Sequence, residues 1–166
     1  KQQISEVMFN LLDSHDTERI LTTAKGNIQH VKAALTFLYL QKGTPCIYYG
    51  TELALIGGPD PDCRRVMPWD RVSEGNNMLN FMKKLIKVRK EIASIIQHGN
   101  YRLEEVKPDV LSLKWNYQGK EVQAIFNQSK EDFALNRDSV DLASHCQFED
   151  GQQVILPDGF VVYMLD

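Results

Sequence analysis

The first half of the chain alternates continuous apolar runs with apolar residues at helical spacing. Residues 7–12 and 46–49 are short apolar runs, typical of strands buried on both faces of a parallel sheet. Residues 27–41 and 77–93 carry apolar side chains three or four positions apart, which predicts two helices. A Gly-, Pro- and Asp-rich loop over residues 56–70 is longer than ordinary connections, so we expect it to be functional. This order of elements is typical of a parallel β/α protein.

The first predicted helix has clear end signals. Asn27 is a good N-cap residue, and it precedes apolar positions that repeat with the helical period: Val31, Ala34, Leu35 and Leu38. Gly43 and then Pro45 follow the helix, in the usual order of stop signals. Two β/α units are too few to close a parallel barrel, which needs eight. The first half is therefore either an unusual small fold or a piece of a larger one.

From residue 100 onward the apolar positions alternate with a period of two. Turn signals lie at residues 108–109 and 118–119. The predicted strands are residues 101–106, 110–117, 122–127, 133–135, 147–148, 154–156 and 160–165. Short strands at regular spacing favour an antiparallel β-sandwich. We therefore expect an α/β part over residues 1–95 and a small all-β domain over residues 100–166.

Composition narrows the class of protein. The 166 residues are 43% hydrophobic and 25% charged, with a net charge of −3, which is typical of a soluble globular protein. No basic footprint indicates nucleic acid, and no apolar run is long enough to span a membrane. Cys46, Cys63 and Cys146 show no metal or disulfide spacing, which favours reduced thiols and a cytoplasmic location. The chain starts at Lys1 without Met, so we expect the natural N-terminus to be missing.

Two polar clusters follow the two predicted strands, where ligands bind in parallel β/α folds. The first cluster is residues 13–19, which read Asp-Ser-His-Asp-Thr-Glu-Arg. The second contains Glu52 and the charged and aromatic residues of the following loop: Asp60, Asp62, Arg64, Arg65 and Trp69. Carboxylates and Arg can hold pairs of hydroxyls, and aromatic faces can stack on sugar rings. Together the clusters suit a polyhydroxylated substrate.

The sequence also allows other interpretations of the His15–Asp16 pair. A metal site could use His15, Asp16, Asp60 and Asp62, as in some phosphohydrolases, although the usual metal motifs are absent. The contiguous Ser-His-Asp of residues 14–16 is not a serine-hydrolase triad, because triads are assembled from distant positions. The plainest alternative is structural: Asp13 or Asp16 caps backbone N–H groups where the chain enters a helix.

Three motifs in order resemble the α-amylase family of glycoside hydrolases. Residues 9–17, FNLLDSHDT, resemble the fourth conserved region of that family, at the end of the seventh barrel strand. Residues 43–52, GTPCIYYGTE, resemble its eighth-strand segment. Residues 57–70, GGPDPDCRRVMPWD, resemble the neopullulanase, cyclomaltodextrinase and maltogenic amylase branch. The resemblance implies the last two β/α units of a TIM (β/α)8 barrel followed by a small C-terminal β-sandwich.

The resemblance also implies a role for particular residues. Asp16 corresponds to the catalytic carboxylate that stabilises the transition state, and His15 to the donor that binds hydroxyls of the same sugar. Asp60 and Arg64 correspond to residues that bind the next glucose units on the non-reducing side. Glu52 corresponds to a structural position. The nucleophilic Asp and the acid/base Glu belong to the fourth and fifth barrel strands, and we find neither in this chain.

These implied roles define the expected function. The parent protein is expected to cleave α-glucosidic bonds in maltooligosaccharides, cyclodextrins or pullulan with retention, whereas the chain alone is expected to be inactive. A non-catalytic carbohydrate-binding or structural fragment is the alternative. No cofactor is expected. The calcium ligands that the family often uses cannot be identified in this sequence. An uncovered barrel edge predicts that the chain associates with itself.

Overall fold

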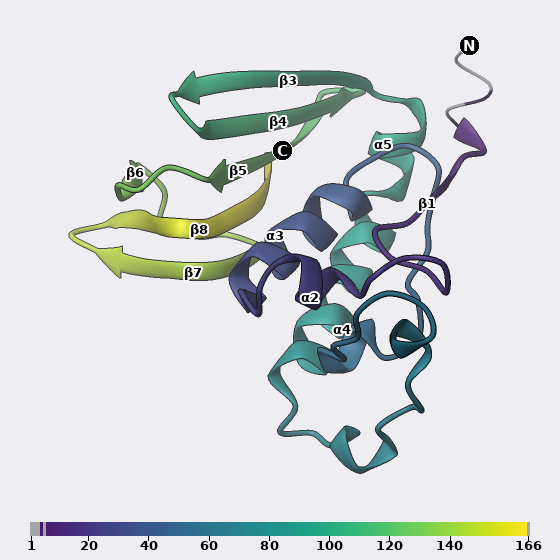
Figure 1. Ribbon diagram of the computed structural model, residues 1–166. Helices are drawn as coiled ribbons and strands as arrows, with labels where there is room; N and C mark the ends of the chain where they lie inside the picture. The colour runs from purple at the N-terminus through teal and green to yellow at the C-terminus, as the bar shows by residue number, and fades with distance from the viewer. Residues whose placement is uncertain (1–3, 5, 166) are drawn as a thin grey trace. The chain divides into compact units, whose positions relative to one another are not determined.

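The computed structural model describes residue 4 and residues 6–165, and Lys1 lies outside that part of the chain. The chain divides between Lys87 and Val88 into two compact units (Figure 1). The first unit mixes helices with two very short strands, and the second consists mainly of an antiparallel sheet. In the part of the chain that the structure describes, no helix has the length and apolar character needed to cross a membrane.

The first unit follows the predicted β/α order. Its elements are β1 (Phe9–Asn10), α2 (Ile20–Thr23), α3 (Ile28–Tyr39), β2 (Thr44–Pro45), η1 (Thr51–Leu53), η2 (Asp62–Arg64), η3 (Trp69–Arg71) and α4 (Asn77–Glu91), the last of which continues into the second unit. Strands β1 and β2 pair in parallel, with Phe9 opposite Thr44 and Asn10 opposite Pro45. The parallel β/α pattern expected from the sequence is therefore present.

Helix α3 forms for the reasons that its sequence suggested. The Asn27 side chain accepts hydrogen bonds from the backbone N–H groups of Gln29 and His30, both at 3.1 Å. These bonds satisfy two of the donors that a helix start leaves unpaired. After the helix, Gly43 has φ +89°, and a Cβ there would lie 2.5 Å from the Met8 carbonyl oxygen. Only glycine lets the chain pass so close to β1.

The predicted strands of the first unit are wrong in extent. Residues 7–12 were expected to form a buried strand, but only Phe9–Asn10 is a strand and the Phe9 side chain is 64% exposed. Residues 46–49 are irregular, and the strand lies just before them, at Thr44–Pro45. These strands are short and exposed because they have few neighbouring strands. Among the described residues, β1 pairs only with β2. An apolar run becomes a buried strand only where other elements cover both its faces.

The helix predicted over residues 77–93 is present as α4, and a short helix that was not predicted follows it. Helix α4 ends at Glu91, and α5 (Ala93–His98) follows after Ile92. Ile92, Ile95 and Ile96 are all buried, so apolar periodicity continues across the break. Periodicity alone therefore could not locate it.

The second unit is a six-stranded antiparallel sheet. Its strands are β3 (Asn100–Lys107), β4 (Val110–Tyr117), β5 (Lys120–Asn127), β6 (Phe133–Leu135), β7 (Leu142–Glu149) and β8 (Gln152–Leu165). The order is β3-β4-β5-β8-β6, and β7 also pairs with β8. The predicted hairpin turn between β4 and β5 has positive φ at both Gln118 and Gly119, as a type I′ turn requires.

One continuous curled sheet replaces the expected pair of separate sheets. Residues 154–156 and 160–165 were predicted as two strands, but they belong to the single 14-residue strand β8. Its first part pairs with β6 and its last part with β5, while β7 pairs along both (Figure 1). The sequence Pro157-Asp158-Gly159 is typical of a turn, yet strand β8 continues through it. Of these three residues, Asp158 has a positive φ. Opposite this point, the register of β7 shifts around His145, which is typical of a β-bulge.

Candidate active site

A tight turn after β1 carries His15 and Asp16. The Ser14 N–H donates to the Thr17 hydroxyl at 2.9 Å, and the Asp16 N–H donates to the Ser14 hydroxyl at 3.1 Å. Side chains of Ser and Thr that bond nearby backbone groups stabilise turns in this way. The turn leaves the Asp16 side chain 70% exposed and free to meet a ligand.

Asp13 has a structural position. It is 4% exposed, and its carboxylate accepts hydrogen bonds from the Ile20 N–H at 3.1 Å and the Thr51 hydroxyl at 2.9 Å. It therefore caps α2 and joins the first loop to η1. The structural alternative raised for Asp13 or Asp16 thus applies to Asp13.

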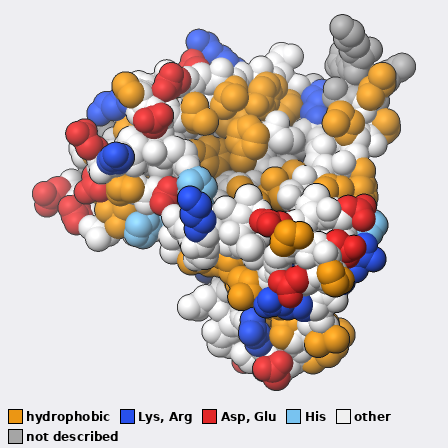
Figure 2. Space-filling model, viewed as in Figure 1, with side chains coloured by type: hydrophobic (Ala, Val, Ile, Leu, Met, Phe, Trp, Pro, Cys, Tyr) orange, Lys and Arg blue, Asp and Glu red, His pale blue; other side chains and the backbone are white. Residues whose placement is uncertain are grey.

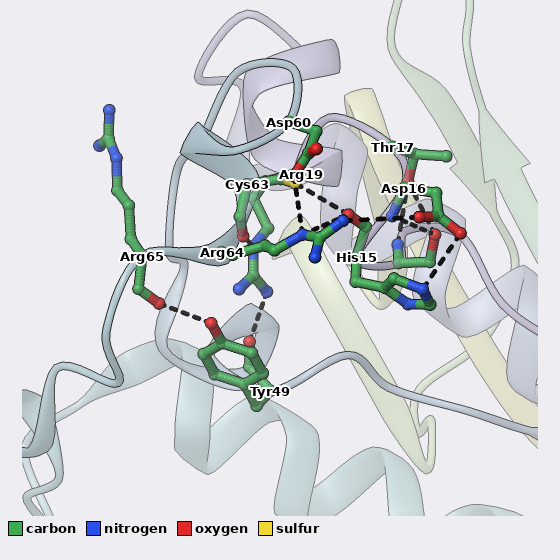
Figure 3. Close-up of polar contacts among 10 residues, drawn as sticks. His15, Asp16, Thr17, Arg19, Tyr49, Asp60, Cys63, Arg64 and Arg65 are labelled. Atoms are coloured by element: carbon green, nitrogen blue, oxygen red, sulfur yellow. Dashed lines mark hydrogen bonds and ion pairs between the residues drawn. The ribbon is translucent and has the colours of Figure 1, made fainter.

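Asp16, His15, Arg64 and Asp60 form one polar cluster (Figure 3). The Asp16 carboxylate lies 3.2 Å from His15 Nε2 and 3.7 Å from Arg64 Nη2. Arg64 Nε is also 2.7 Å from the Asp60 carboxylate. The structure therefore brings together the four residues that the sequence named, from two loops more than forty positions apart. Because all four side chains are at least 48% exposed, they can exchange these contacts for a ligand's hydroxyl groups.

Asp62 and Arg65 form a separate pair in the same loop. Arg65 Nε and Nη2 lie 2.7 and 2.9 Å from the two Asp62 carboxylate oxygens, and the Gly58 N–H donates to Asp62 at 2.6 Å. Of the four side chains considered as a metal set, Asp16 and Asp60 thus pair with Arg64, whereas Asp62 pairs with Arg65. Among residues 4 and 6–165, no three His, Cys, Asp or Glu side chains are grouped so that they could hold a metal ion.

The Asp62–Arg65 pair predicts a pH-dependent contribution to stability. The hydrogen bonds from Arg65 and then from the Gly58 N–H lower the pKa of Asp62 below its ordinary value. The contribution is therefore present above the ordinary Asp pKa and is lost as the pH falls through the lowered folded value. We expect Arg65→Gln to raise the pKa of Asp62, measured by carboxyl ¹³C NMR titration. An unchanged Asp62 titration would show that Arg65 does not set this pKa.

Two residues of the site had no separate role in the sequence interpretation. Arg19 and Cys63 are both fully buried, and Arg19 Nε donates to the Cys63 carbonyl at 2.7 Å. The Cys63 thiol and Arg64 Nε both donate to the His15 carbonyl, each at 3.2 Å. No sequence signal could have found these contacts, because each joins positions 44 or more residues apart.

An exposed carboxylate, imidazole and guanidinium thus lie together in the loops that follow β1 and β2, and comparison with known proteins shows the family. The family model described as alpha amylase, catalytic domain, matches residues 1–142. The chain therefore belongs to the α-amylase catalytic-domain family.

Several similar proteins are named maltogenic amylase, neopullulanase or cyclomaltodextrinase. The chain is 43% identical over 129 residues to the intracellular maltogenic amylase of Bacillus subtilis (strain 168), a match that covers 76% of this chain and 22% of that protein. It is 44% identical over 101 residues to neopullulanase 2 of Thermoactinomyces vulgaris, covering 61% and 17%. A solved cyclomaltodextrinase superposes with a TM-score of 0.79 at 32% identity, covering 99% of this chain and 30% of that one. The chain spans about a fifth of the length of these curated relatives.

Proposed function

We propose that this chain supplies part of the active site of a retaining α-glucan hydrolase. The observation that carries the proposal is the exposed Asp16 carboxylate between His15 and Arg64. In this role Asp16 binds hydroxyls of the sugar at the cleavage point, and His15 donates a hydrogen bond to the same sugar. Arg64 and Asp60 bind the next glucose unit. The test is to replace Asp16 with Asn in the longer protein and to measure kcat.

The chemistry explains why such a carboxylate matters. Retaining glycosidases pass through an oxocarbenium-like transition state, and hydrogen bonds to sugar hydroxyls become stronger as the ring distorts. An interaction that is stronger in the transition state than in the bound substrate raises kcat. Asp16 accepts such hydrogen bonds without forming a covalent bond. The reaction requires only carboxyl groups, so the proposal includes no resident cofactor.

The fold supports a position at the end of a barrel. In the proposal, β1 with α3 and β2 with α4 are the seventh and eighth β/α units of a (β/α)8 barrel, and the sheet of the second unit follows it. The parallel pairing of β1 with β2, with α3 between them in sequence, supports this layout. The site loops then follow the carboxyl ends of the strands, where TIM-barrel enzymes place their active sites.

The names of the relatives suggest the substrates. Proteins named maltogenic amylase, cyclomaltodextrinase and neopullulanase are similar to this chain. We therefore propose maltooligosaccharides, cyclodextrins or pullulan as substrates of the longer protein. One relative is named intracellular, which supports an intracellular location for this protein as well.

The purified 166-residue chain is expected to release no reducing sugar from pullulan or a cyclodextrin. The resemblance places the nucleophile and the acid/base on strands whose motifs this chain does not contain, and a carboxylate that only binds hydroxyls cannot replace them. The assay is reducing-sugar release over several hours, with the longer protein as the positive control. Turnover by the chain that persists through repurification would contradict this prediction.

The purified chain is also expected to associate with itself. Figure 2 shows apolar side chains at the surface near the N-terminal end of the described chain. The exposed apolar residues of this segment include Val7, Met8, Phe9 and Leu11. An exposed apolar strand edge is a template for pairing with another chain. Light scattering should show a mass that rises with concentration, and Phe9→Lys should reduce it. A monomer at every concentration would contradict the expectation. The control is Val66→Lys, at an exposed apolar residue of the loop over residues 56–70.

A further inference from the structure

Arg19 is a buried cation without a carboxylate partner among the described residues. Its side chain is completely buried, Nε donates to the Cys63 carbonyl at 2.7 Å, and Nη1 donates to the Tyr49 carbonyl. The guanidinium carbon lies 4.0 Å from the centre of the Tyr48 ring and 4.6 Å from that of Tyr49. Nη2 has no hydrogen-bond partner among residues 4 and 6–165. Burying a charge with one unpaired donor is costly, so the contacts that Arg19 does make must matter to the fold or to function.

The loop of residues 57–65 packs closely on Arg19. The Arg19 N–H donates to the Gly57 carbonyl at 3.0 Å, and the Gly57 N–H donates to the Thr22 hydroxyl at 2.9 Å. A Cβ at Gly57 would lie 2.7 Å from the Asp62 carbonyl oxygen and 2.9 Å from the Cys63 Cα. No side chain fits at that position. The loop is therefore fixed at its start by Gly57 and in its middle by the Arg19 guanidinium.

Cys63 connects Arg19 to the polar cluster of Asp16, His15, Arg64 and Asp60. Its carbonyl accepts the hydrogen bond from Arg19, while its thiol donates to the His15 carbonyl at 3.2 Å. The next residue, Arg64, reaches Asp16, Asp60 and the His15 carbonyl. Cys63 thus contacts both Arg19 and the His15 carbonyl, beside the residue that reaches Asp16.

We propose that Arg19 is a positioning residue. Its buried guanidinium holds the loop of residues 57–65 against the turn that carries His15 and Asp16. It thereby sets the distance between Asp16 and Arg64. This role rests on the function proposed above. Arg suits it because a planar guanidinium donates in fixed directions to two carbonyls from different segments while stacking on aromatic rings. A Lys ammonium is a compact point charge and cannot reproduce this fork.

Thiol labelling of the 166-residue chain tests the positioning directly. Cys63 is a fully buried residue of this loop, and Cys146 in the second unit is an internal reference. Labelling of a protected thiol follows the population of the open loop. Arg19→Lys and Arg19→Met should raise the labelling rate of Cys63 by at least about tenfold, the factor for losing one hydrogen bond to a charged group. Cys146 should keep its rate, and Arg65→Lys, an exposed arginine of the same loop, is the matched control.

Two results of this labelling would overturn the proposal. One is that Cys63 stays as protected in both Arg19 variants as in Arg65→Lys. The other is that Cys63 and Cys146 become reactive together, because Arg19 would then serve general stability rather than the position of one loop. Peptide mass spectrometry assigns each labelled thiol.

Kinetics of the longer protein test the consequence. Arg19→Lys should lower kcat by roughly 10- to 100-fold, the effect of a small misplacement of catalytic groups, while KM changes less. An unchanged kcat and KM would overturn the positioning role. Failure of the proposed function looks different: Asp16→Asn would then retain full kcat, while the labelling of Cys63 would still decide whether Arg19 fixes the loop.

Discussion

Replacing Asp16 with Asn in the longer protein is expected to lower kcat by about a hundred- to a thousandfold, the usual loss when one preorganised electrostatic group is removed from a transition state. Asn keeps the size of the side chain and one acceptor oxygen. It removes the negative charge that, in the proposed role, stabilises the distorted, positively charged sugar ring. KM should change less than kcat, because the lost interaction is strongest in the transition state. Initial rates on a cyclodextrin and on maltotriose measure both constants.

The free energy of unfolding of Asp16→Asn shows whether the loss of kcat results from damage to the fold. Asp16 is 70% exposed and its contacts to His15 and Arg64 are surface contacts, so Asp16→Asn should change the free energy of unfolding by less than about 0.5 kcal/mol. Asp62→Asn is the matched control, since Asp62 lies in the facing loop and pairs with Arg65 instead. We expect it to keep near-normal kcat. Equal losses in the two variants, or a large loss of stability in Asp16→Asn, would contradict the catalytic role.

The parts of the fold that could be predicted are those fixed by local interactions. Asn27 caps α3 with its own side chain, and the Gln118–Gly119 turn depends on backbone conformations of two adjacent residues. Strand β4 begins and ends where the alternating pattern does. The burial of residues 7–12 and the continuity of β8 depend instead on which segments lie alongside. Neither could be read from a local pattern, because the same apolar run is a buried strand or an exposed edge according to its neighbours.

The candidate site shows the same division. Asp16, His15, Asp60 and Arg64 were named from motifs that resemble a family, and the structure brings them into contact. Arg19 lies only three positions after Asp16, yet its contacts come from Tyr49 and Cys63, 30 and 44 residues away. Spacing along the chain carries no information about such partners. The residues that hold a site in place are therefore harder to predict than those that face the ligand.

Phe160→Ala is expected to destabilise the sheet unit by about 3–5 kcal/mol, the usual cost of removing a fully buried aromatic side chain. Phe160 is 0% exposed and lies in β8 opposite Phe126 of β5 and Ser144 of β7. Its ring centre is 5.9 Å from that of Phe126. The substitution opens a cavity at the point where β8 joins both neighbours, so the surrounding strands cannot close over it without losing register. Since a domain has a total stability of about 5–15 kcal/mol, a large fraction of the unit's stability should be lost.

Urea unfolding measures this loss, with Phe148→Ala as the control. Phe148 is the same residue type in the same sheet, in β7, but its side chain is 55% exposed. We expect its removal to change stability by less than about 1 kcal/mol, because it leaves no cavity. The Phe160 variant should unfold at a clearly lower urea concentration with an unchanged slope, since the same surface is exposed on unfolding. If both variants unfolded at the same midpoint, β8 would not be the strand on which the unit depends. A large difference would support a central place for β8, which among the described strands pairs with β5, β6 and β7.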